Sequence, residues 1–183
     1  MTQITIGIVV GSLRKESFNR RLADALTKLA PTVFAFKHLR IDDLPLYNQD
    51  DDASPSAAAK RLKAEVLACQ GLLFVTPEYN RSIPGVLKNA LDHASRPYGQ
   101  NAWAGKPAGV IGTSPGNVGT AVAQQHLRVV LAYLDIPTLG QPEAYVQFKD
   151  GLIDQSGEIG AASRGLLQGW MNGYAAWVKR FVS

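Results

Sequence analysis

The sequence predicts an α/β fold of three layers, in which helices cover both faces of a five-stranded parallel sheet with strand order 2-1-3-4-5. Two observations lead to this prediction. Five short apolar runs alternate with segments of helical periodicity along the 183 residues, and such alternation is typical of parallel strands joined by right-handed crossovers. The third run, Leu72–Thr76, is apolar without alternation, as expected for a central strand that is covered on both faces.

The first three elements follow from apolar patterns near the N-terminus. Ile4–Val10 is apolar throughout and predicts a buried strand, and Asn19–Leu29 is amphipathic and predicts the first helix. Thr32–Phe36, preceded by Pro31, predicts the second strand. A turn-rich connection follows these elements, and it ends in an acidic run that indicates a solvated helix entry.

The second helix is expected over residues 56–68, where Leu62, Val66 and Cys69 recur at helical spacings of three and four. Ser54 is expected to cap this helix, with Pro55 in its first position.

The second half of the chain repeats the strand and helix alternation. The remaining elements are expected at residues 84–94 (helix), 108–112 (strand), 118–134 (helix), 143–146 (strand) and 166–181 (helix). The five units fit the flavodoxin-like arrangement. Because no repeat, linker or low-complexity tract interrupts them, we expect a single domain over residues 1–183.

The bulk composition is that of an ordinary globular protein, with 46% hydrophobic and 19% charged residues. No run of about 18 apolar residues predicts a membrane span, and no secretory signal pattern is visible at the N-terminus. The single cysteine, Cys69, excludes an internal disulfide and predicts a buried thiol in a reducing, cytoplasmic setting. The three histidines show no metal-ligand spacing, so we expect no metal.

The net charge of +4 raises the question of nucleic-acid binding. The 19 Lys and Arg residues are scattered, and no basic block with interleaved aromatic residues is present. A small anionic ligand therefore explains the charge better, and we expect neither nucleic acid nor a membrane as a partner.

In such sheets ligands bind beyond the carboxyl ends of the strands, where the strand order reverses. Here that point is the mouth of the first and third strands. The segment Gly11–Asn19 follows the first strand and enters the first helix, so unsatisfied N–H groups and the helix dipole favour an anion. It matches neither common dinucleotide nor P-loop fingerprint, which favours a terminal monophosphate, although a plain polar turn remains the alternative.

Two further loops open at the same edge. The segment Thr76–Gly85 contains two prolines that stiffen it, and a planar heteroaromatic ring could lie against Tyr79. The alternative is a rigid surface loop whose tyrosine only covers the core. The segment Gly112–Gly119 contains a G-x-S-x-G pattern around Ser114, but Pro115 has no N–H for an oxyanion hole and the order of a Ser-acid-His triad fails. A hydrolase is therefore disfavoured.

Taken together, these motifs resemble the NADPH-dependent FMN reductase family, and within it the soluble quinone and chromate reductases. The matching segments, in the family's order and spacing over essentially the whole chain, are Gly11–Asn19, Thr76–Asn80, Ser82–Gly85, Leu87–Asp92, Ser95–Arg96 and Gly105–Pro107. A phosphoreceiver domain shares the strand order but requires acidic residues that this chain lacks at the corresponding strand ends.

The resemblance implies a tightly bound FMN, with NADPH or NADH as co-substrate. Residues implied to hold the phosphate are Ser12, Leu13, Arg14, Lys15, Glu16, Ser17, Phe18 and Asn19. Residues implied to meet the flavin ring or ribityl chain are Pro77, Glu78, Tyr79, Asn80, Ser82, Thr113 and Ser114, although Pro115 departs from relatives. Tyr79 and Arg96 are implied to border the acceptor. A homodimer or homotetramer is implied, with Arg128 and Glu143 at tetramer contacts.

The implied mechanism needs no catalytic side chain, because the flavin N5 atom would take hydride from NAD(P)H and pass it to the acceptor in a ping-pong cycle. The acceptor could be a quinone, chromate, an azo dye, a nitroaromatic or free flavin. A flavodoxin-like electron carrier is a weaker alternative because such carriers are acidic around the flavin. A third interpretation is a regulatory module that binds flavin without redox turnover.

Overall fold

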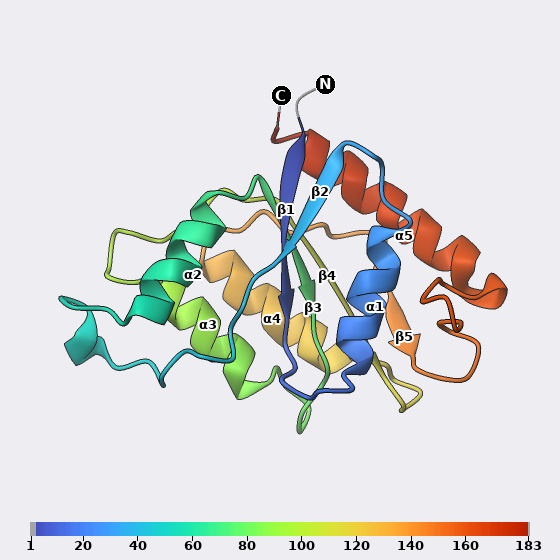
Figure 1. The fold of residues 1–183 in the computed structure, drawn as a ribbon, viewed down its shortest axis with the longest axis horizontal. Helices are drawn as coiled ribbons and strands as arrows, with labels where there is room; N and C mark the ends of the chain where they lie inside the picture. The colour runs from blue at the N-terminus through green and yellow to red at the C-terminus, as the bar shows by residue number, and fades with distance from the viewer. Residues whose placement is uncertain (1–2, 183) are drawn as a thin grey trace.

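The computed structural model describes residues 3–182 and contains a five-stranded parallel sheet in the order β2-β1-β3-β4-β5 (Figure 1). The fold class predicted from the sequence is confirmed. The strands are β1 (Ile4–Val10), β2 (Phe34–His38), β3 (Gly71–Val75), β4 (Ala108–Ser114) and β5 (Tyr145–Gln147). The helices are α1 (Phe18–Thr27), α2 (Ala57–Leu67), α3 (Gly85–Ser95), α4 (Ala121–Tyr133) and α5 (Ala161–Lys179), with a short 3₁₀ helix at Gln49–Asp51.

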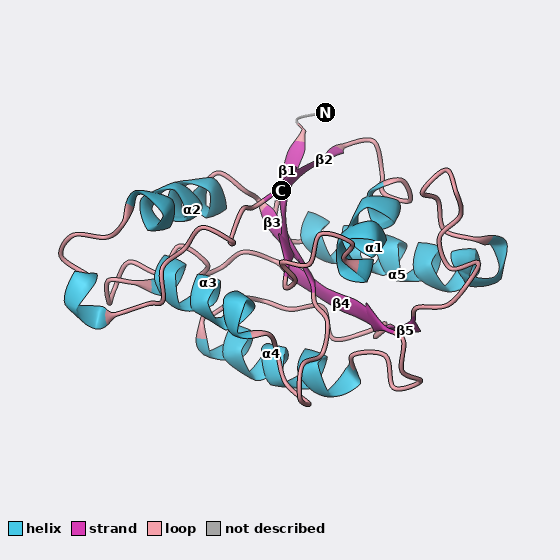
Figure 2. Ribbon diagram, turned by 60° about the horizontal axis from the view of Figure 1, so that its bottom comes forward, coloured by secondary structure: helices cyan, strands magenta, loops and turns pink. Residues whose placement is uncertain are grey.

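The helices cover the sheet in two layers (Figure 2). Helices α1 and α5 lie on one face, and α2, α3 and α4 lie on the other. Strand β3 serves both layers, because Leu73 and Val75 join the core under α1 and α5 whereas Leu72 and Phe74 join the core under α2, α3 and α4. This double burial explains why its sequence is apolar without alternation. Among residues 3–182, no helix combines the length and the apolar composition that crossing a bilayer requires.

The predicted cap of α2 was misplaced by two residues. The hydroxyl of Ser56, not that of Ser54, accepts the N–H of Ala59 at 3.1 Å. The N–H of Ser54 instead donates to the carbonyl of Asp51 and closes the turn after the 3₁₀ helix. Pro55 therefore precedes the cap, where its fixed φ directs the chain into the helix.

Strand β4 is longer than predicted and α4 begins later. The last three residues of β4 extend beyond β3 and pair with β5, from Gly112 opposite Tyr145 to Ser114 opposite Gln147. Helix α4 then starts at Ala121 rather than at Val118. Consequently Thr113 and Ser114 belong to the end of a strand, and the loop after β4 is confined to residues 115–120.

The ends of β1, β3 and β4 are packed closely around Thr76. The N–H of Thr76 donates to Ile111 in β4 at 3.0 Å, and the N–H of Gly11 donates to Val75 at 3.0 Å. A methyl group added at Gly11 would lie 2.6 Å from the Thr76 hydroxyl, and one added at Gly112 would overlap the Thr76 carbonyl oxygen. Only glycine fits at these two positions, so the loops that follow the three strands start from fixed points.

Candidate functional site

Three loops meet at the carboxyl edge of the sheet, at the bottom of Figure 1. We call residues 11–17 the first loop, residues 76–84 the second loop and residues 115–120 the third loop. Asn19, two residues after the first loop, links α1 to the end of β4. Its amide nitrogen donates to the carbonyl of Thr113 and its amide oxygen accepts the N–H of Thr113, both at 2.9 Å. Both residues are buried, so the pair fixes the first loop relative to the third.

The first loop presents open N–H groups and cationic side chains. The hydroxyl of Ser17 caps α1 by accepting the N–H of Arg20 at 3.2 Å. Within residues 3–182, the N–H groups of Lys15, Glu16 and Phe18 have no protein acceptor. These donors, the start of α1 and nearby cationic side chains together suit an anion.

Aromatic residues support the first loop from the side of α1. The guanidinium of Arg14 lies 4.9 Å from the ring centroid of Phe18, and Phe18 stacks on Phe148 with centroids 3.9 Å apart. Arg14 itself is exposed. This arrangement leaves the cation of Arg14 at the surface of the loop, where an anion can reach it. The chain after β5 thus contributes a residue, Phe148, that the sequence motifs did not indicate.

The second loop contains a tight hairpin turn. Tyr79 and Ser82 exchange both backbone hydrogen bonds, each at 3.0 Å. Asn80 and Arg81 between them have φ angles of 50° and 64°, the pattern of a type I′ turn. Tyr79 is 50% exposed, so one side of its ring is open to a planar ligand.

Glu78 ties the second loop to α4. Its side chain is only 9% exposed, and one carboxylate oxygen accepts the N–H of Ala123 at 3.1 Å, in the first turn of α4. The other oxygen accepts from Arg81 at 3.1 Å. The hydroxyl of Ser82 lies 3.1 Å from the Nδ1 atom of His126, which is also on α4. Carboxylate binding at a helix N-terminus is favourable, so this loop is held by side chains as well as by its prolines.

The hydroxyl groups at the end of β4 bond to this chain's own backbone. Thr113 donates to the carbonyl of Val146 at 2.9 Å. Ser114 donates to the carbonyl of Gly119 across the third loop. Within residues 3–182, no histidine is hydrogen-bonded to Ser114, so the structure provides no base for a serine nucleophile.

The structure does not bring Arg96 to these loops within one chain. Helix α3 begins beside the second loop and runs back along the sheet, and Arg96 follows its last residue. Eleven helical residues span about 16 Å. The guanidinium of Arg96 lies 5.9 Å from the ring of Tyr47 instead, and Lys63 donates to the Arg96 carbonyl at 2.6 Å.

Arg128 and Glu143, implied to be tetramer contacts, form an ion pair with each other at 3.7 Å. A hydrogen bond with the Tyr145 hydroxyl lowers the pKa of the Glu143 carboxyl, and Gln125 and Arg128 add to the effect despite partial burial. The described residues hold no group of three or more His, Cys, Asp or Glu side chains placed to bind a metal ion.

The chain is similar to known proteins over nearly its whole length. A family model described as NADPH-dependent FMN reductase matches residues 4–151. The sequence is 54% identical over 177 residues to a 2-hydroxy-1,4-benzoquinone reductase of Burkholderia sp. The aligned region covers 96% of this chain and 97% of that protein. It is 49% identical over 181 residues to a quinone reductase of Pseudomonas putida, with coverage of 98% and 97%.

A solved structure agrees closely with the fold. FerB, a flavoenzyme NAD(P)H:(acceptor) oxidoreductase from Paracoccus denitrificans, superposes with a TM-score of 0.93 at 42% sequence identity, covering 97% of this chain and 98% of FerB. A flavodoxin variant from Pseudomonas aeruginosa, at 19% identity and a TM-score of 0.59, covers 96% of this chain and 99% of its own, and shares the fold alone.

We predict that Asn19→Asp destabilises the protein. The change removes the donor to the Thr113 carbonyl and places a buried carboxylate oxygen against it, so the free energy of unfolding should fall by about 2–3 kcal/mol. That corresponds to a drop in Tm of roughly 5–10 °C in thermal unfolding followed by circular dichroism.

The matched control is Asn117→Asp in the exposed third loop. Asn117 accepts from the side chain of Gln147 at 2.7 Å through its oxygen, which aspartate retains, so the Tm of this variant should stay within about 1 °C of the parent. Equal unfolding temperatures for the two variants would contradict the role given to Asn19.

Proposed function

The chain belongs to the NADPH-dependent FMN reductase family, and from that membership we propose that it is an FMN-dependent quinone reductase that uses NADPH or NADH as co-substrate. The sequence-based predictions of the family, of an oxidoreductase and of FMN with NAD(P)H are confirmed by the comparisons. Bound FMN would supply the redox chemistry, which is the passage of a hydride from NAD(P)H to a quinone in two half-reactions.

One observation above all supports an FMN site at the three loops. The N–H groups of Lys15, Glu16 and Phe18 are open at the start of α1 beside the cation of Arg14, and this donor set fits a terminal phosphate. Ser12 and Leu13 complete this loop, and the hydroxyl of Ser17 holds the first turn of α1 in place. In this proposal Asn19 acts through Thr113, as the residue that positions the loop.

The second loop would hold the flavin ring. The half-exposed ring of Tyr79 offers a face for a planar heteroaromatic. Because Glu78 is anchored to α4 and Pro77 is buried, the N–H groups of residues 78–80 and the carbonyl groups of residues 77–80 have fixed directions. Thr113 and Ser114 would approach the ligand through the backbone at the end of β4, since their hydroxyls are engaged elsewhere.

A quinone is the acceptor that the relatives favour. The proteins 54% and 49% identical to this chain are named for quinone reduction. Their names also favour an enzyme over an electron carrier, as does the basic net charge. The buried thiol of Cys69 supports a reducing, cytoplasmic location.

We also propose that the protein acts as a homodimer across α3 and α4. Tyr98, Val129 and Tyr133 are 87%, 73% and 85% exposed there, and they line a cavity of about 750 Å³ between the two helices. Exposed apolar patches of this kind mark interaction surfaces. A two-fold antiparallel pairing of α3 would bring Arg96 of the partner subunit toward the second loop, which would reconcile the role implied for Arg96 with its position.

An anaerobic titration tests the proposed function. The purified protein should be yellow, lose its visible flavin absorbance on addition of NADPH or NADH, and regain it on addition of 1,4-benzoquinone. A colourless protein, or a bound flavin that neither nucleotide bleaches, would overturn the proposal.

We predict that Arg14→Ala binds FMN about 10- to 100-fold more weakly, because one charge-assisted contact with the phosphate is lost. The measurement is FMN fluorescence quenching on the apoprotein. Lys60→Ala, which removes an exposed cation on α2, is the control and should bind FMN as the parent does. Unchanged FMN affinity in the Arg14 variant would refute the phosphate site.

We predict that Tyr133→Glu dissociates the dimer, since it places a charge in the centre of the apolar patch. Light scattering coupled to gel filtration should then give the mass of one chain. Leu166→Glu is the control, because Leu166 is also an exposed apolar residue but lies on α5. A monomeric parent protein, or a Tyr133 variant that remains a dimer, would rule out this interface.

A further inference from the structure

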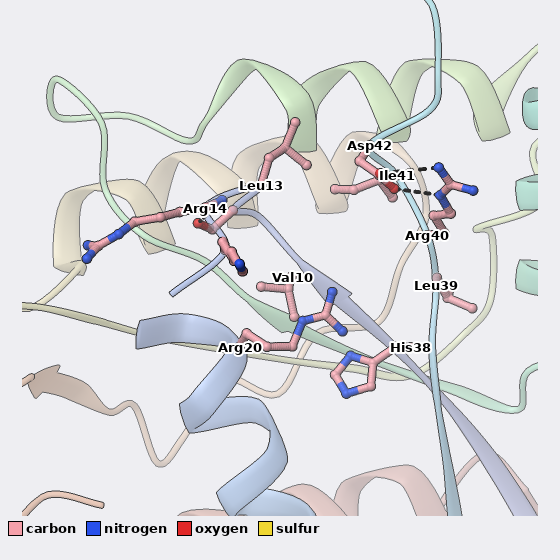
Figure 3. Close-up of a pocket in the computed structure, with 11 residues that line it drawn as sticks. Val10, Leu13, Arg14, Arg20, His38, Leu39, Arg40, Ile41 and Asp42 are labelled. Atoms are coloured by element: carbon pink, nitrogen blue, oxygen red, sulfur yellow. Dashed lines mark hydrogen bonds and ion pairs between the residues drawn. The ribbon is translucent and has the colours of Figure 1, made fainter. Parts of the chain in front are cut away.

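A cavity of about 380 Å³ lies on the other side of the first loop from the second and third loops (Figure 3). Its lining comes from the end of β1, the first loop, α1, the last residue of β2 and the chain that follows β2. The lining residues are Val10, Ser12, Leu13, Arg14, Lys15, Arg20, His38, Leu39, Arg40, Ile41 and Asp42. Because β2 and β3 flank β1 on opposite sides, this cavity is separate from the face offered by Tyr79.

The cavity is cationic. Arg20 and Lys15 have no carboxylate within 4.0 Å among residues 3–182. The one acidic lining residue, Asp42, is paired with Arg40 at 2.8 Å, and the Arg40 guanidinium lowers the pKa of the Asp42 carboxyl. The charge left over is positive, which favours an anionic ligand.

Side-chain directions single out Arg20 and His38. In Figure 3 the Arg20 side chain extends from α1 past Val10 toward the ring of His38, whereas Arg14 points away from both and Arg40 turns to Asp42. His38 is bound to Asp24 through Nε2 at 2.7 Å, and its Nδ1 atom is buried without a hydrogen-bond partner. The planar guanidinium of Arg20, which pairs with no carboxylate among residues 3–182, can donate two hydrogen bonds to the oxygens of a phosphate group.

Apolar side chains form one wall of the cavity, which indicates a ligand larger than a bare ion. Val10, Leu39 and Ile41 are buried at the wall of the cavity, and Leu13 overhangs it with more than half of its surface exposed. A cavity of this volume with an apolar wall and a few polar groups is typical of sites for small organic ligands. A phosphorylated nucleoside combines both requirements, because its base and sugar meet apolar side chains while its phosphate meets the cations.

We propose that this cavity binds the adenosine 2′-phosphate of NADPH, with Arg20 as the residue that contacts the phosphate. The inference rests on the proposed function, because the nicotinamide must reach the flavin at the second loop. The ends of β2 and β3 are two strand spacings apart, or about 10 Å, a distance that an extended dinucleotide spans. Because NADH lacks the 2′-phosphate, the cavity would bind NADPH more tightly than NADH.

The test compares NADPH with NADH in the FMN-loaded enzyme. Arg20→Ala should raise the KM for NADPH by about 10- to 100-fold, the value of one charge-assisted hydrogen bond, and change the KM for NADH by less than about twofold. Arg20→Lys should recover part of the loss. Arg21→Ala is the matched control, since Arg21 is the next residue on α1 but packs on Phe148 at 5.1 Å, outside the cavity.

Calorimetry with 2′-AMP and 5′-AMP on the same FMN-loaded proteins gives a readout that does not depend on turnover. The parent should bind 2′-AMP more tightly than 5′-AMP, and Arg20→Ala should abolish the difference. Equal effects of Arg20→Ala on both dinucleotides, or none on either, would overturn the inference, as would loss of FMN from this variant, which would assign the cavity to the flavin phosphate. A parent protein that neither nucleotide reduces would instead refute the proposed function.

Discussion

The candidate site depends on the paired hydrogen bonds between the Asn19 side chain and the backbone of Thr113. Asn19 lies on α1 and Thr113 lies on β4, and β3 runs between β1 and β4 in the sheet. Because both residues are buried, a broken pair would leave polar groups without water or a partner. The position of the first loop relative to the third is therefore fixed, because any other arrangement would leave these buried polar groups without hydrogen bonds. The close contacts of Gly11 and Gly112 with Thr76 add a steric constraint at the same place.

This framework separates polar groups that hold the loops from polar groups that can meet a ligand. The hydroxyls of Thr113 and Ser114 and the carboxylate of Glu78 are all engaged within the chain. The exposed groups are the cation of Arg14, the open N–H groups of the first loop and the ring of Tyr79. Rigid loops with a few exposed donors lower the conformational entropy that a cofactor must overcome on binding, which suits a tightly held flavin.

Most of the fold could be predicted from the sequence because local patterns determine it. The apolar runs and helical spacings located the five strands and the five α-helices, and the rule that ligands bind at the carboxyl ends of parallel strands located the loops. The cap at Ser56 was missed because Ser54 offers the same side chain two residues earlier. The extension of β4 to Ser114 was missed because it depends on pairing with β5, and pairing between distant segments leaves no local mark in the sequence.

The roles of individual site residues were harder to predict, for the same reason. Nothing near Asn19 indicates that its partner is 94 residues away. Arg96 is only 12 residues from the second loop in sequence, yet α3 lies between them and places Arg96 at the end of the helix far from that loop. Arg20 and His38 lie near each other only because β2 pairs in register with β1, where His38 is opposite Ile8.

The strand order also explains how one basic edge could serve two phosphates. Strand β1 is an inner strand, so the first loop has a neighbour on each side: the second loop, which follows β3, and the chain after β2. Arg14 and Arg20 are separated by the N-terminal turn of α1 and point in different directions. Two like-charged phosphates bound to one cation would repel each other, whereas cations on opposite sides of the loop can each neutralise one. A modest net charge of +4 is then sufficient, because Arg14 and Arg20 both lie at this edge.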